Sequence, residues 1–85
     1  MKTKKEIQTE IINLIEHSDE FKNGNVRYNT MLDYIDIHSN GANKNSFDSD
    51  FIRLLYPYKS DSFFNPHQKY VTYRVYTKYE NRPEQ

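Results

Sequence analysis

Apolar residues recur at helical spacing near the start of the chain. They fall at i, i+4, i+7 and i+8, on one face of an α-helix, and they are Ile7, Ile11, Leu14 and Ile15. Thr3 and Glu6 precede this stripe at the spacing of a capping box, which satisfies free backbone donors at a helix start. The pattern predicts a helix from about Lys4 to residues 17–20.

A second helical pattern covers residues 43–56. Its apolar face consists of Phe47, Phe51, Leu54, Leu55 and Tyr58. Pro57 disfavours helical geometry in the residue before it, so the helix should stop there. The opposite face is polar and carries one cation in the body of the helix, Arg53.

The segment between these two patterns contains turn and cap signals. Residues 22–25 have strong turn chemistry, and Val26–Tyr28 is short and β-prone, which predicts one brief strand. Asn29 or Thr30 then fits the cap of another helix, with Asp33 close to the positive end of its dipole. The buried side of that short helix would be formed by Met31, Leu32, Ile35 and Tyr34, and Gly41 would terminate it.

The C-terminal part alternates with a period of two. Val71, Tyr73 and Val75 alternate with polar or aromatic residues, which is typical of a half-buried strand. Together with residues 58–64 and a tip at residues 65–68, this strand predicts a β-hairpin. Residues 80–85 form a charged tail that we expect to fray.

The expected fold class is therefore α+β, as one small domain over residues 1–85. Three helices are followed by a β-hairpin, with a short strand between the first two helices. The predicted core draws on every element and consists of Ile7, Ile11, Leu14, Ile15, Leu32, Ile35, Phe51, Leu54, Leu55, Val71 and Val75.

This order of elements resembles a winged helix-turn-helix domain, in which the third helix enters a major groove and the hairpin forms the wing. The resemblance is one of topology and covers nearly the whole chain. It implies a small DNA-binding regulator that reads duplex DNA, and it is compatible with a homodimer. The nucleic-acid-binding residues it implies are Lys44, Asn45, Ser49 and Arg53 on the third helix and His67, Gln68 and Lys69 at the wing tip.

The hairpin also mixes basic and aromatic residues. Lys69, Arg74 and Lys78 lie at near-alternate positions, and Tyr70 and Tyr76 interleave with them. This arrangement can follow a sugar-phosphate backbone and stack on bases, which adds Arg74 to the candidate nucleic-acid-binding residues. The same residues can equally form the polar face of a two-layer fold.

Charge and composition support a second hypothesis. The chain has 12 basic and 12 acidic residues, so it has no strong overall field to attract nucleic acid. Asp48 and Asp50 on the third helix repel phosphate. The alternative is therefore a protein-binding inhibitor of the anti-defence or host-takeover type, whose partner is a host protein and whose contacts include Tyr70, Tyr76, Asp48 and Asp50. The abundance of residues with AT-rich codons indicates a phage or mobile element of an AT-rich bacterium.

Other classes of function lack a sequence signal. The chain has no cysteine, its three histidines are not in ligand-spaced motifs, and neither glycine belongs to a phosphate-binding loop. We therefore expect no enzymatic activity, no metal and no cofactor. No apolar run approaches a membrane-spanning length, and we expect a cytoplasmic location with no membrane partner.

Overall fold

The first helix forms where the sequence predicts it. In the computed structural model, which describes residues 2–40, 49, 51–56, 58–65 and 70–79, helix α1 spans Lys4–Glu16. The backbone N–H of Glu6 donates to the Thr3 hydroxyl at 3.2 Å, and the Thr3 N–H donates to the Glu6 carboxylate at 3.1 Å. This capping box confirms the predicted helix start.

A single helical turn and a glycine lead from α1 into the sheet. Helix α2 spans Asp19–Lys22 and is capped by Ser18, whose hydroxyl accepts from the Phe21 N–H at 3.2 Å. Gly24 follows with φ 76°, a left-handed conformation that glycine adopts without steric cost. The chain therefore reverses direction at this turn and enters β1.

Four strands form one antiparallel sheet in the order β1-β2-β4-β3. They are β1 (Val26–Thr30), β2 (Tyr34–Asn40), β3 (Tyr58–Asn65) and β4 (Tyr70–Tyr79). The hairpin of β3 and β4 and the strand that begins at Val26 are confirmed. Strand β4 lies between β2 and β3, so the last strand in sequence is central in the sheet.

The predicted second helix is wrong, because most of it is strand β2. Ile35 and Ile37 lie opposite Val75 and Tyr73 of β4 and are fully buried. Met31–Asp33 form the turn into β2, closed by the Met31 N–H, which donates to the Tyr34 carbonyl at 2.8 Å.

The predicted order of three helices followed by a hairpin is also wrong. Between β2 and β3, the described part of the chain has only a short helical segment at residues 51–54, with Ser49 also helical. The chain is therefore α+β, but its sheet has four strands and two of them precede this segment. The basis for the winged-helix resemblance is lost.

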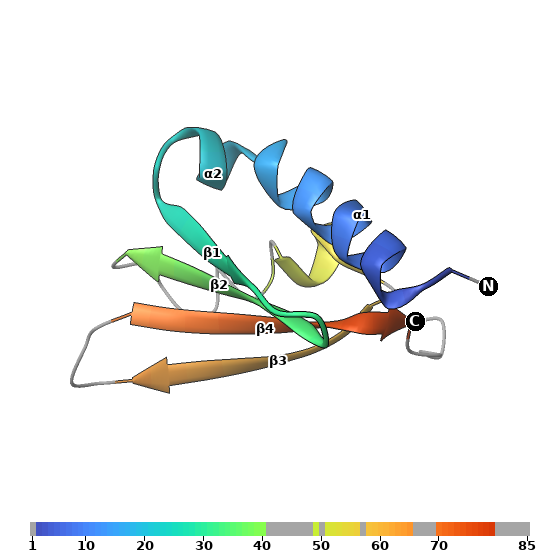
Figure 1. Ribbon diagram of the computed structural model, residues 1–85. Coiled ribbons are helices and arrows are strands. Elements are labelled where there is room, and N and C mark those ends of the chain that lie inside the picture. Colours follow the sequence, from blue (N-terminus) through green and yellow to red (C-terminus); the bar gives the residue numbers. More distant parts are fainter. Residues whose placement is uncertain (1, 41–48, 50, 57, 66–69, 80–85) are drawn as a thin grey trace.

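Both α1 and the segment at residues 51–54 lie on the same face of the sheet, so the fold has two layers (Figure 1). The core between the layers consists of Ile7, Ile11, Ile15, Val26, Ile35, Ile37, Phe51, Leu55, Tyr58, Val71, Tyr73 and Val75. Leu14 and Leu54 are only partly buried. Leu32, which we expected in the core, is 58% exposed in the turn between β1 and β2.

The helices of the described residues are short or amphipathic. None of them is long and apolar enough to cross a membrane.

Candidate functional site

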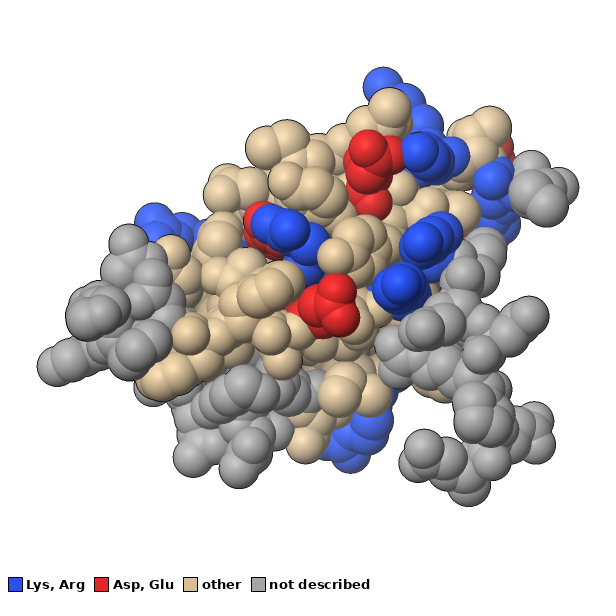
Figure 2. All heavy atoms as spheres, turned by 90° about the horizontal axis from the view of Figure 1, so that it is seen from below, with Lys and Arg blue, Asp and Glu red and all other residues tan. Residues whose placement is uncertain are grey.

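The second face of the sheet carries no helix in the described part of the chain. We call it the open face, and Figure 2 views the molecule from this side. Strand alternation and the register of pairing place its side chains, because residues directly opposite one another on neighbouring strands share a face. It consists of Arg27 and Asn29 (β1), Tyr34, Asp36 and His38 (β2), Lys59, Asp61 and Phe63 (β3), and Tyr70, Thr72, Arg74, Tyr76 and Lys78 (β4).

An ion pair occupies the centre of the open face. Arg74 of β4 lies opposite Asp36 of β2 and donates two hydrogen bonds to it, from Nε at 2.8 Å and from Nη2 at 3.1 Å. These hydrogen bonds to Asp36 raise the pKa of Arg74 above its ordinary value. The guanidinium therefore stays charged and is held in one place.

Aromatic rings from the two neighbouring strands, β2 and β3, flank this guanidinium. The Cζ atom of Arg74 lies 4.1 Å from the ring centre of Tyr34 and 5.3 Å from that of Phe63, both within cation–π range. Tyr34 in turn meets Tyr76 edge to face at 6.4 Å. Phe63 is still 48% exposed, so it has ring surface to offer to a ligand.

Two lysines lie beside Tyr76 on the open face. The Nζ atoms of Lys59 and Lys78 are each 5.8 Å from its ring centre. The Tyr76 hydroxyl donates to Asp61 at 3.0 Å, and this hydrogen bond is the main cause that raises the tyrosine's pKa. The result is a rigid aromatic ring with two cations at its rim.

The open face is more basic than the chain as a whole. Among the described residues, its cations are Arg27, Lys59, Arg74 and Lys78 and its carboxylates are Asp36 and Asp61, whereas the complete chain has a formal net charge of zero. Acidic and basic side chains alternate on the surface in Figure 2. A local excess of positive charge exists here without an overall field.

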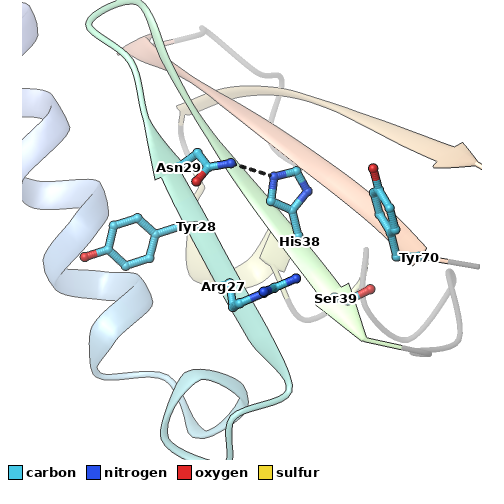
Figure 3. Close-up of a pocket in the computed structure, with 6 residues that line it drawn as sticks. All are labelled: Arg27, Tyr28, Asn29, His38, Ser39 and Tyr70. Atoms are coloured by element: carbon cyan, nitrogen blue, oxygen red, sulfur yellow. Dashed lines mark hydrogen bonds between the residues drawn. The ribbon is translucent and has the colours of Figure 1, made fainter. Parts of the chain in front are cut away.

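At one end of the open face, a pocket of about 360 Å³ lies over β1 and β2. We call it the edge pocket, and Figure 3 shows its lining: Arg27, Tyr28, Asn29, His38, Ser39 and Tyr70. Asn29 and His38 are hydrogen-bonded to each other, and Tyr70 stands on the far side of His38. The lining residues come from three strands, β1, β2 and β4.

The site residues expected from the sequence are distributed differently. Arg74, Tyr70 and Tyr76 share the open face. Arg53 lies beyond the other face, where it lines a hollow with Asp19 and Glu20 of α2, and Ser49 is an exposed helical residue. The remaining expected positions lie outside the described residues: Lys44, Asn45, Asp48, Asp50, His67, Gln68 and Lys69.

Sequence reasoning missed Arg27, Asn29 and His38, which the pairing of β1 with β2 brings to the same face as Tyr70. The signal was present as alternation in Tyr34–Ser39, where Ile35, Ile37 and Ser39 are buried between more exposed residues.

Metal binding finds no support in the described parts of the chain, where no three His, Asp or Glu side chains are grouped as ligands. Comparison with known proteins gives no relative either, because no protein-family model, curated protein or solved structure matches the chain.

Proposed function

We propose that this protein is a binding module for single-stranded nucleic acid and that the open face is its binding surface. The observation that carries the proposal is the interleaving of aromatic and basic side chains on an uncovered sheet. Aromatic rings such as Phe63 stack on unpaired bases, and cations such as Lys59 and Lys78 follow the phosphates. Arg74 and Tyr76 are already held by hydrogen bonds to Asp36 and Asp61, so these two side chains lose little freedom on binding.

The shape of the surface favours a single strand over a duplex. A major groove admits one helix or a two-stranded ribbon, whereas this face is formed by four strands side by side. In addition, stacking on a side chain requires a base that is not paired and stacked in a duplex.

The helical segment at residues 51–54 is poorly suited to read a duplex. Phe51 is fully buried and packs one side of the segment against Tyr73, with the two ring centres 6.1 Å apart. Arg53 lies near the carboxylates of α2, which repel phosphate. We therefore assign nucleic-acid binding to the open face of the sheet and not to a recognition helix.

Fluorescence anisotropy with labelled 12-mers of single-stranded DNA, single-stranded RNA and duplex DNA tests this proposal. We expect both single strands to bind more tightly than the duplex. Affinity should fall with salt at a slope of about −2, because the three cations Arg27, Lys59 and Lys78 each release roughly 0.7 counterions from a single strand. A duplex that binds as tightly as the single strands would contradict the proposal.

Phe63 and Phe64 provide a matched pair of variants. They are adjacent on β3 and similarly exposed, at 48% and 55%, but strand alternation directs them to opposite faces. Phe63→Ala should weaken single-strand binding by about 1–3 kcal/mol, the usual contribution of one stacked base. Phe64→Ala should leave binding unchanged, and equal effects of the two variants would place the binding surface elsewhere.

Protein binding is the second candidate function, and the turn between β1 and β2 favours it. Met31 and Leu32 are 52% and 58% exposed there. Hydrogen bonds from Gln8 and Thr77 to their carbonyls hold the turn, at 2.8 and 2.7 Å. Rigid exposed apolar side chains of this kind serve as anchors in protein interfaces. Failure to bind any nucleic acid at low salt would favour this candidate.

A further inference from the structure

The edge pocket contains a histidine whose two ring nitrogens are both engaged. The Nδ1 atom of His38 lies 2.9 Å from the Thr72 hydroxyl, and Nε2 lies 3.2 Å from the Asn29 amide nitrogen. Since an amide nitrogen only donates, Nε2 must accept, and the proton of the neutral ring is on Nδ1 and is donated to Thr72. The imidazole is thus a fixed wall of the pocket.

This arrangement leaves part of the Asn29 amide free. Its second N–H and its oxygen have no partner among the described residues, and Asn29 is exposed. One donor and one acceptor on the same planar group match the edge of a nucleobase, and adenine, with an amino group beside a ring nitrogen, is the usual partner of asparagine.

Tyr70 and Arg27 provide the other two groups that a nucleotide requires. The Tyr70 ring stands perpendicular to the His38 ring, with ring centres 5.7 Å apart, and it borders the pocket opposite Asn29 (Figure 3). Arg27 lies opposite His38 on β1, is exposed, and has no carboxylate partner in the described part of the chain. A base can therefore lie against an aromatic ring while a phosphate meets an uncompensated guanidinium.

We propose that the edge pocket holds one adenine nucleotide of the bound strand, with its base against Tyr70, the base edge on Asn29 and a phosphate on Arg27. This inference rests on the proposed function of the open face and assigns its base preference. A volume of about 360 Å³ is within the range of small-molecule sites. The pocket is continuous with the open face, because the pocket residues Asn29, His38 and Tyr70 belong to that face.

Anisotropy titrations with 12-mers of deoxyadenosine, deoxycytidine and thymidine test the inference. The wild-type protein should bind the adenine strand roughly 5- to 100-fold more tightly than the thymidine strand, the discrimination that one two-point base contact provides. Asn29→Ala should abolish this preference by weakening binding of the adenine strand to the level of the thymidine strand. Asn13→Ala, an exposed asparagine on α1, is the matched control and should retain the preference.

Arg27→Ala separates the phosphate contact from the base contact. It should weaken all strands alike and make the salt slope shallower by about 0.7, while the adenine preference persists. Lys5→Ala removes an exposed cation from α1 and should change neither quantity.

The outcomes distinguish this inference from the proposed function. Single-strand binding without an adenine preference, or with a preference that survives Asn29→Ala, overturns the edge-pocket assignment and leaves the proposed function intact. If no strand binds, NMR titration of the wild-type protein with adenosine monophosphate decides whether the edge pocket binds a free nucleotide. Shifts confined to His38 and Tyr70 would then assign the pocket to a free nucleotide and overturn its role in strand binding. If these shifts are absent, neither the pocket assignment nor the proposed function holds.

Discussion

Arg74 and Asp36 lie opposite each other on β4 and β2 and form a two-point ion pair in the middle of an exposed sheet surface. Their side chains are 31% and 16% exposed, so both are partly shielded from water by the rings around them. The pair links the two central strands and holds the guanidinium between Tyr34 and Phe63.

Asp36→Ala should lower the free energy of unfolding by about 1–3 kcal/mol, because it removes two charge-assisted hydrogen bonds and leaves a partly shielded cation unpaired. Solvent screening keeps the loss below that of a fully buried pair. Urea denaturation measures it. Arg27→Ala, on the same face but without a carboxylate partner among the described residues, should stay within about 0.5 kcal/mol; equal losses would refute a stabilising role for the pair.

Ile35→Ala and Leu32→Ala should differ strongly, although sequence patterns place both residues in the core. Ile35 is fully buried between β1 and β4, and its truncation should cost about 2–5 kcal/mol. Leu32 is 58% exposed, and its truncation should cost less than about 0.5 kcal/mol. The same denaturation experiment compares them, and a loss of more than 1 kcal/mol for Leu32 would show that the turn is packed in solution.

Tyr76 should titrate above the ordinary tyrosine range, because its hydroxyl donates to Asp61 and this raises its pKa. Because the pKa is raised in the folded state, this hydrogen bond contributes fully to folding stability below the unfolded-state pKa of about 10. The contribution is lost as the pH rises through the folded-state pKa. NMR of the tyrosine rings follows each group separately. Asp61→Asn should lower the pKa of Tyr76 toward its ordinary value.

Tyr28 is the internal control for that titration. Its pKa is raised by a hydrogen bond to Glu16 at 2.8 Å, on the other side of the sheet. Asp61→Asn should leave Tyr28 unchanged, and a parallel shift of both tyrosines would mean that the substitution acts through global unfolding.

Thr77→Val should loosen the turn between β1 and β2. The Thr77 side chain is almost fully buried, and its hydroxyl donates to the Leu32 carbonyl at 2.7 Å. Valine has the same shape but leaves this carbonyl without its donor, at a cost of about 1–2 kcal/mol. Faster hydrogen exchange of the Met31 amide would report the change, and Thr9→Val on the exposed side of α1 should leave that rate unaltered.

Local signals predicted those elements that are determined locally. The capping box of Thr3 and Glu6 and the stripe from Ile7 to Ile15 identified α1, and the alternation after Tyr70 identified β4. Both patterns are complete within one element, so no knowledge of the rest of the fold was needed.

The error at β2 came from two competing local patterns. Thr30 and Asp33 fit a helix cap, but in the fold Asp33 pairs with Lys4 and its carbonyl accepts from the Thr77 N–H at 3.0 Å. Pairing with β4 stabilises Ile35 and Ile37 in a strand, and such non-local pairing overrides weak local preference.

The part of the candidate site on β4 could be foreseen, because it is determined within one strand. Tyr70, Arg74 and Tyr76 alternate on one strand, so their common face follows from the sequence. The approach of Arg27 and Asn29 depends on the register of β1 against β2, and this register became visible only once β2 was recognised as a strand.

The central place of β4 has a kinetic consequence. Its partners β2 and β3 and the helix α1 all precede it in the chain, so the ribosome synthesises the middle of the sheet after both of its flanks. Until residues 70–79 emerge, Ile35 and Ile37 lack their pairing partners on β4, and one edge of β2 remains open to pairing with another chain. We therefore expect the paired strands β1 and β2 to be prone to aggregation until β4 is in place, and we expect the non-local pairing of residues 34–40 with residues 70–76 to slow folding more than formation of α1 does.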